Sequence, residues 1–140
     1  MNEHIKALGL RAFKEAKADF LRDKHLIAVA YVVSGAEILD FNLTFEGKEQ
    51  KESAYAELVK IAKEKNADAI ITINDARSAH GESQEARECL YLSISGPNLS
   101  TWSRCLFYER RGQEIVFEEE VDSENDILNL LPGWPDQSCM

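Results

Sequence analysis

The feature that most constrains this chain is an almost unbroken apolar run, HLIAVAYVV, at residues 25–33. Such a run, rich in β-branched residues, is typical of an interior strand whose two faces are both covered. Ser34-Gly35 follows as a two-residue turn, and apolar and wetter residues then alternate from 38 to 45. We therefore expect an antiparallel hairpin with one buried face on its second strand.

Helical periodicity flanks this hairpin on both sides. Apolar residues recur at steps of three and four in residues 2–22 and again in residues 48–65. Asn66 stands where a residue that tolerates left-handed geometry would end the second helix. A short apolar strand at 68–73 follows that helix, so we expect a crossover connection from an earlier strand.

The last third of the chain predicts three further strands, at residues 88–95, 101–110 and 114–121. Their connectors are a Gly96-Pro97-Asn98 loop and an Arg111-Gly112 turn. If Arg111 and Gly112 are the two loop residues, four pairs face each other across the last hairpin: Trp102 with Val121, Arg104 with Glu119, Leu106 with Phe117, and Tyr108 with Ile115.

A final short helix is expected at residues 124–131, before a loosely ordered tail at 132–140. The element order is then α-β-β-α-β-β-β-β-α, which favours one α+β domain over residues 1–140. We expect a single mixed, mainly antiparallel sheet of about five to six strands flanked by helices. This order resembles the profilin-like and roadblock-like layouts, a likeness of topology that implies no function.

A second resemblance comes from the succession VAYVVSGAEILDFNLTF, an amphipathic helix, ADAIITINDARSA, and the segments ECLYLSIS and RCLFYERR. Over roughly residues 25–121 the chain resembles a loose family of uncharacterised small bacterial and phage α+β proteins. The resemblance implies a fold of this kind and offers no activity.

Charge and composition exclude several classes of function. Sixteen Lys and Arg against 25 Asp and Glu give a net charge of -9, which opposes binding to a nucleic acid backbone. No segment has the length of apolar sequence that a membrane span needs, and the charged N-terminal segment is unlike a signal peptide. Cys89, Cys105 and Cys139 have no C-x-x-C spacing, so we expect reduced thiols, a cytoplasmic location, and no metal or cofactor.

The polar segment after the third strand is the place where a ligand site is best expected. Strand ends after a crossover often border ligand crevices, and five polar residues gather here within seven positions: Asn74, Asp75, Arg77, Ser78 and His80. Asp75 would act as a ligand or base and Arg77 as an anion contact. The alternative is that these residues only cap the strand and form a polar loop reaching to Arg87.

Other chemistry has weaker support in the sequence. A nucleophilic group of Ser78, His80 and Asp75 lacks the G-x-S-x-G elbow, and metal binding by Asp75, His80 and Glu82 lacks a rigid element to hold the ligands. The acidic run Glu118 to Asp126 has Ile127 where a calcium loop needs glycine. It is read instead as strand and helix-cap residues, or as a surface for a basic partner.

Three aromatic residues are candidates for an interface: Tyr91, Phe107 and Trp134. Tyr91 and Phe107 lie with Cys89, Cys105 and Val116 on a sheet face that a second subunit would have to cover, while Trp134 either packs on the core or anchors a partner. The leading hypothesis is a non-catalytic, self-associating protein-interaction module. A small-molecule or hydrolytic site at residues 74–80 and an acidic inhibitor of a basic protein surface are the two alternatives.

Overall fold

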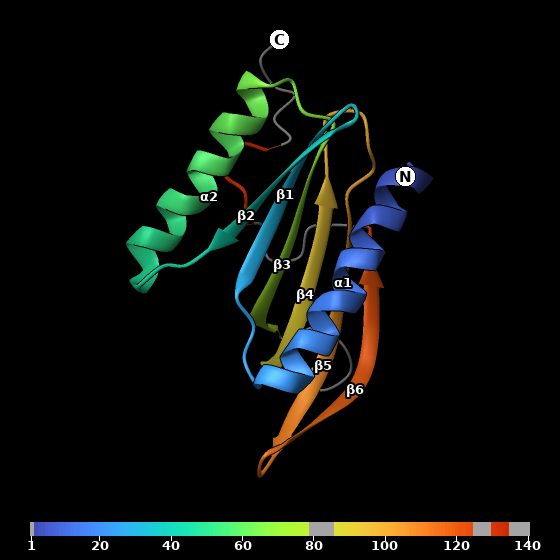
Figure 1. Ribbon diagram of the computed structural model, residues 1–140, viewed down its shortest axis with the longest axis vertical. Helices are drawn as coiled ribbons and strands as arrows, with labels where there is room; N and C mark the ends of the chain where they lie inside the picture. Colours follow the sequence, from blue (N-terminus) through green and yellow to red (C-terminus); the bar gives the residue numbers. More distant parts are fainter. Residues whose placement is uncertain (1, 79–85, 125–129, 135–140) are drawn as a thin grey trace.

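The computed structural model describes residues 2–78, 86–124 and 130–134. This part of the chain contains two helices and six strands (Figure 1). In chain order they are α1 (Glu3–Asp23), β1 (Ala28–Ser34), β2 (Glu37–Leu43), α2 (Gly47–Glu64), β3 (Ala69–Ser78), β4 (Arg87–Ser95), β5 (Trp102–Arg111) and β6 (Glu114–Ser123). Residues 125–129 of the final helix predicted at 124–131 lie outside the described residues, as does most of the predicted tail.

The six strands form one open sheet in the order β2-β1-β3-β4-β5-β6. Every neighbouring pair is antiparallel. Because β1 lies between β2 and β3 and is antiparallel to both, β2 and β3 run parallel, and α2 connects them as the predicted crossover. The expected α+β fold with a mainly antiparallel sheet is therefore confirmed.

The first hairpin also follows the prediction, with a small shift of its turn. Ser34 pairs with Glu37, so the two turn residues are Gly35 and Ala36 rather than Ser34 and Gly35. Gly35 has a φ of 62°, in the left-handed region that favours glycine at a hairpin turn.

The two helices cover opposite faces of the sheet. Along β1, Ala30 and Val32 pack with the buried residues of α2, whereas Val33 packs with those of α1. In Figure 1, α1 crosses in front of the sheet and α2 lies alongside β2. Gly9 brings α1 close to the sheet, since a Cβ at this position would lie 2.7 Å from Cδ1 of Ile94 on β4.

The last hairpin has a different register from the predicted one. Arg111 pairs with Glu114, so the loop residues are Gly112 and Gln113, and the register shifts again between Leu106 and Tyr108. In consequence Tyr108 faces Phe117 instead of Ile115. The remaining predicted pairs are also wrong: Leu106 faces Glu120, Arg104 faces Asp122, and Val121 faces Cys105.

Candidate functional site

The predicted ligand segment belongs mostly to a strand and not to a loop. β3 continues to Ser78, and residues 74–78 pair with residues 87–91 of β4. This pairing satisfies the backbone N–H and C=O groups of residues 74–78. The polar loop predicted to reach Arg87 therefore does not include these five residues, and that part of the prediction is wrong. Alternation along the strand separates Asn74 from Asp75, and His80 lies outside the described residues.

Asp75 meets Tyr108 on the α1 side of the sheet. The Tyr108 hydroxyl donates a hydrogen bond to Oδ1 of Asp75 at 2.7 Å. Burial raises the pKa of the Asp75 carboxyl; the hydrogen bond from Tyr108 opposes this, nearby Glu88 raises the pKa further, and Arg110 lowers it. Burial and the contact with Asp75 also raise the pKa of Tyr108, which keeps the phenol protonated as a donor.

Charged side chains from three strands extend this pair. Arg110 Nε lies 3.4 Å from Glu88, and Arg77 Nη1 lies 3.9 Å from the other carboxylate oxygen. Arg110 also donates to the backbone carbonyl of Lys24 at the end of α1, at 3.0 Å. The cluster thus ties β3, β4 and β5 to α1, and its carboxylates already have partners, as expected for a network that holds structure.

Asn74 lies on the opposite side of β3 and contacts α2. Its side-chain amide donates a hydrogen bond to the hydroxyl of Tyr55, and both residues are buried. Asn74 and Asp75 contribute to the wall of a cavity of about 300 Å³ at the end of the sheet where β1 begins. The predicted residues Asn74 and Arg77 therefore belong to two separate contacts, and the structure does not gather them around one ligand.

Tyr91 and Phe107, predicted as interface residues, are parts of the core. Both have no exposed surface, and they form a buried cluster with Cys89 and Cys105 on the α2 side of β4 and β5. The chain itself therefore covers these two aromatic side chains, and the expected spare apolar surface is absent there. Arg87 adds to this cover, because its guanidinium lies 3.9 Å from the centre of the Phe107 ring.

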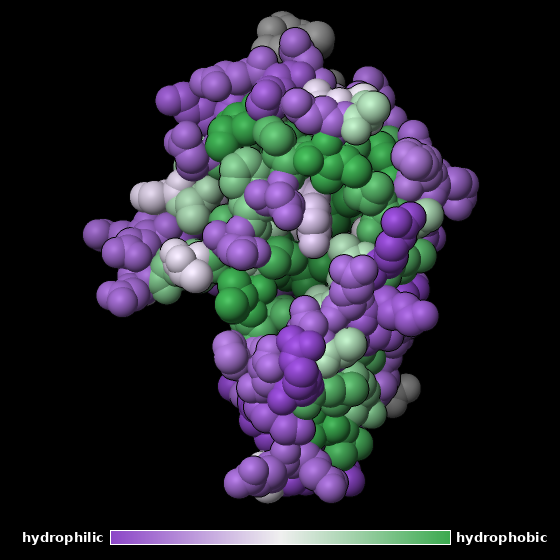
Figure 2. Space-filling view, viewed as in Figure 1, coloured by the Kyte–Doolittle hydropathy of each residue, from purple (hydrophilic) through white to green (hydrophobic). Residues whose placement is uncertain are grey.

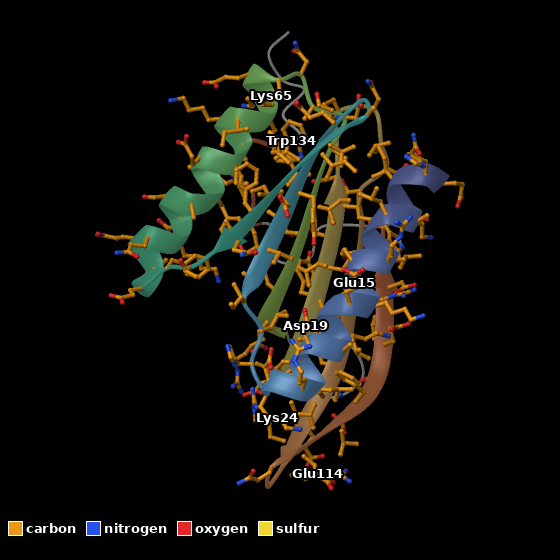
Figure 3. The ribbon with its side chains drawn as sticks, in the orientation of Figure 1. Glu15, Asp19, Lys24, Lys65, Glu114 and Trp134 are labelled. Carbon is orange, nitrogen blue, oxygen red and sulfur yellow. The ribbon has the colours of Figure 1, made fainter. Side chains whose placement is uncertain are left out.

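Trp134 packs back on its own chain. It joins the apolar cluster beneath α2, and its Nε1 donates to the backbone carbonyl of Ser95 at 3.3 Å. Figure 3 shows it near the Lys65 end of α2. The indole is partly buried, as expected for an aromatic residue whose polar atom has found a partner.

Three carboxylates of the acidic run on β6 have arginine partners within the sheet. Arg104 binds Asp122 through two contacts, at 2.7 and 3.1 Å, and its Nε lies 3.5 Å from Glu120. Arg87 forms an ion pair with Glu119. These ion pairs link β6 to β5 and to β4, while Asp126 lies outside the described residues.

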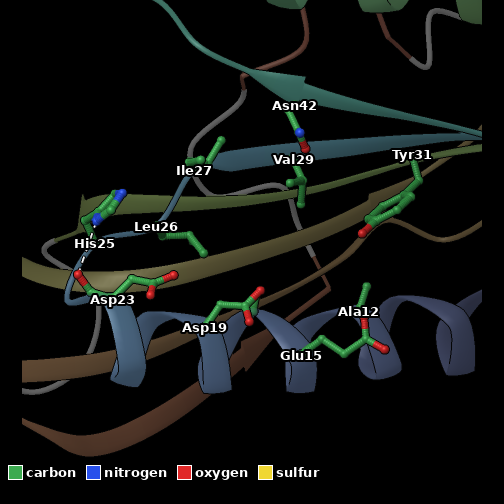
Figure 4. A pocket seen from close by; sticks show the side chains of 11 residues that line it. Ala12, Glu15, Asp19, Asp23, His25, Leu26, Ile27, Val29, Tyr31 and Asn42 are labelled. Atoms are coloured by element: carbon green, nitrogen blue, oxygen red, sulfur yellow. Dashed lines mark hydrogen bonds between the residues drawn. The ribbon is translucent and has the colours of Figure 1, made fainter.

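A second cavity, which the sequence analysis missed, lies between α1 and the hairpin of β1 and β2. It has a volume of about 200 Å³ and is lined by Val29 and Tyr31 of β1 and Asn42 of β2. Three acidic residues of α1 form its other wall, namely Glu15, Asp19 and Asp23. Figure 4 shows Asp19 rising from the helix toward the strands, Glu15 extending along the helix, and Tyr31 reaching down from its strand. We call this cavity the acidic groove.

The charge of the acidic groove acts on Tyr31. Burial raises the pKa of this phenol, and the carboxylates of Glu15, Asp40 and Asp19 raise it further. Asp40 pairs with Tyr31 across β1 and β2. In the part of the chain that the structure describes, neither Glu15 nor Asp40 forms an ion pair, so both charges remain available.

The helical wall has a basic neighbour in Arg22. Arg22 lies 3.1 Å from Asp19 and 2.9 Å from Asp23, and these three side chains are well exposed. No Lys or Arg is among the described residues that line the groove, and His25 only contacts the Asp23 carbonyl at 3.2 Å. Exposed ion pairs of this kind contribute little stability and can exchange one partner for another.

The sequence carried a signal for this groove. Glu15, Asp19 and Asp23 recur at intervals of four, which places three carboxylates along one side of α1. Figure 3 shows Glu15 and Asp19 following each other along that side. The sequence does not show which side of α1 borders the strands. From spacing alone, these carboxylates could equally lie on an ordinary solvent-exposed helix face.

Apolar surface adjoins the charged wall. Ile27, next to β1, lines the groove and is 49% exposed, and Leu26 and Val29 line it as well. Figure 2, in the view of Figure 1, shows green apolar surface between the purple side chains of the two helices. The groove therefore combines an apolar floor with negative charge on the helical side.

Comparison with known proteins adds no further site. No family model, no curated protein and no solved structure matches the chain. Within the described residues, no group of three His, Cys, Asp or Glu side chains could hold a metal ion. Neither of the two described helices is long and apolar enough to cross a membrane.

Proposed function

We propose that this protein is a non-catalytic binding module whose acidic groove receives a basic segment of a partner protein. The observation that carries the proposal is the arrangement of Glu15 and Asp19 opposite Tyr31, above an apolar floor. Lysine and arginine side chains match both features, because their apolar stems can lie on the floor while their charged ends meet the carboxylates.

Charge supports a protein partner in two ways. The net charge of -9 attracts a basic surface at long range, and the unpaired Glu15 and Asp40 offer contacts once the partner is bound. Arg22 can release Asp19 to an incoming cation while keeping Asp23. The proposed function keeps the protein-interaction module of the leading hypothesis and the basic partner of the inhibitor hypothesis. The acidic surface that binds this partner is on α1 and not on β6.

A hydrolytic site at Asp75 has less support. The Asp75 carboxyl is engaged by Tyr108, and the cysteine nearest to it in the sheet pairing, Cys89, is fully buried. The contact with Cys105 and burial raise the pKa of the Cys89 thiol, which makes it a poor nucleophile.

The test is binding of a short labelled peptide of alternating lysine and leucine, followed by fluorescence anisotropy. The variant Glu15→Gln/Asp19→Asn should weaken binding about tenfold, or about 1.4 kcal/mol. The control Glu57→Gln/Glu64→Gln removes two exposed charges from α2, on the other side of the sheet, and should leave the affinity nearly unchanged.

Binding should also weaken as salt is added, because the contacts are charged and near solvent. Equal weakening by the two double variants would assign binding to net charge alone and would overturn the groove as the site. Affinity that does not respond to salt would contradict the proposed charge recognition.

A further inference from the structure

The two edges of the sheet differ in how they are protected against pairing with another chain. Antiparallel pairing leaves the backbone groups of alternate residues on an outer strand directed away from the sheet. β2 and β6 are the two outer strands. Whether either one accepts a further strand depends on its charge and regularity.

β6 has two features that block such pairing. It carries a register irregularity opposite the stretch between Leu106 and Tyr108, and it has five acidic residues, Glu114, Glu118, Glu119, Glu120 and Asp122. A second β6 placed beside it would add its own carboxylates to those of Glu114 and Glu118, which have no ion pair among the described residues. Bulges and charges are the usual protection of a natural sheet edge.

β2 has neither a bulge nor a row of charges. All seven of its residues pair with β1 in one continuous register. Its two charged residues are Glu37, which lies 3.4 Å from Lys65, and Asp40. Leu39, Phe41 and Leu43 are only partly buried along the α2 side of the strand, so their row of apolar side chains ends at this edge.

We propose that two copies of the chain associate by antiparallel pairing of β2 with β2, which joins their sheets into one. In an antiparallel pair, two residues that lie directly opposite each other point to the same face of the sheet. The two-fold axis between the copies must therefore lie beside one residue of β2, which then faces the same residue of the other copy. An axis at Phe41 sets Leu39 against Leu43 of the other copy and Asp40 against Asn42, which are favourable partners.

The neighbouring registers are unfavourable. An axis at Asp40 sets the two Asp40 carboxylates against each other, and an axis at Leu39 sets Glu37 against Phe41. An axis at Asn42 would pair only residues 41–43 of the two strands, so the pairing about Phe41 is favoured. In this arrangement Asp40 of the second copy lies beside Asn42, which lines the acidic groove, so each groove gains a carboxylate.

The oligomeric state, measured by sedimentation velocity over a range of protein concentrations, tests this inference without any peptide. The unmodified chain should form a dimer. Asn42→Asp places a carboxylate opposite Asp40 at two symmetric positions and should weaken dimerisation by about fivefold or more. Asn42→Lys places an opposite charge there and should strengthen it by a similar factor.

Asn42 is exposed, so both variants should fold, which thermal melts by circular dichroism verify. The controls Gln113→Asp and Gln113→Lys make the same charge changes at the exposed turn between β5 and β6 and should leave the dimer unaltered. A chain that stays monomeric at every concentration overturns the inference. So does a dimer that responds equally to Asn42→Asp and Asn42→Lys, because its interface would lie elsewhere.

Discussion

Gly96 lies directly against the backbone carbonyl of Asp68, and a Cβ at Gly96 would overlap that oxygen. Asp68 cannot move aside easily. Its N–H donates to the Val33 carbonyl at 2.7 Å, and its carboxylate accepts from the N–H of Gly35 at 2.8 Å. The end of β4 is therefore fitted to the loop that follows α2.

We expect Gly96→Ala to lower the free energy of unfolding by about 2–3 kcal/mol, because the added methyl group overpacks a fixed backbone. Urea denaturation measures the change. Ser100→Ala, at an exposed position of the same loop, is the matched control and should have little effect. A Gly96→Ala variant as stable as the unmodified chain would show that the two backbones are not in contact.

The Asp75 carboxyl should make stability depend on acidity in a defined direction. Its pKa in the folded chain is above the ordinary value of 3.8, so the folded state holds a proton that the unfolded state has lost. The stabilisation that Asp75 contributes is therefore fully present at pH values below the ordinary pKa. It is lost as the pH rises through the pKa of Asp75 in the folded chain. The effect should be modest, because Asp75 is partly open to solvent.

Asp75→Asn removes this titration and keeps an oxygen that accepts from Tyr108. The difference in unfolding free energy between the two chains should therefore change in favour of Asp75→Asn as pH rises from 3.8. Urea melts at a series of pH values provide the comparison. A difference that is constant with pH would contradict the raised pKa.

A double-mutant cycle distinguishes the observed register of β5 and β6 from the one predicted by the sequence. Arg104 and Asp122 should show a coupling free energy of about 0.5–1 kcal/mol, because the contact is bidentate and only partly exposed. Arg104 and Glu119, the pair expected from the sequence, should show almost none. Alanine variants measured by urea denaturation supply both cycles.

The Tyr31 phenol reports on the charge of the acidic groove. Glu15→Gln removes one of the carboxylates that raise its pKa, so the ionisation of Tyr31 should move toward the ordinary value of 10.0. Two-dimensional NMR with labelled tyrosine follows this residue separately from the others. Glu57→Gln on α2 should leave the Tyr31 titration unchanged, and an equal shift in both variants would contradict a local effect.

Much of the fold could be predicted because its signals are local. The apolar run before Ser34 and the alternation from Ile38 define the first hairpin, and Asn66 has the left-handed φ of 50° expected after α2. These features depend on side-chain periodicity and backbone preference, which are properties of a few neighbouring residues.

The features that could not be predicted depend on distant partners. Residues 74–78 are polar enough for a loop, yet they form a strand because β4 supplies the matching backbone groups. The sequence predicts an open face for Tyr91 and Phe107 because it does not show what covers them, whereas the structure buries both fully. The carboxylates of α1 likewise define a groove only once Tyr31 is placed opposite them.

The irregularity in β6 changes how that strand is to be compared with any other sequence. Ile115 and Phe117 pack on the α1 side, whereas Val121 packs on the opposite side. The strand is therefore two alternating segments joined out of phase, with Glu118 and Glu119 matched to the single residue Phe107. A variant that loses one residue at this junction would become a regular strand in which the residues on both sides keep their faces, and an aligned chain without the bulge would need a gap at this position.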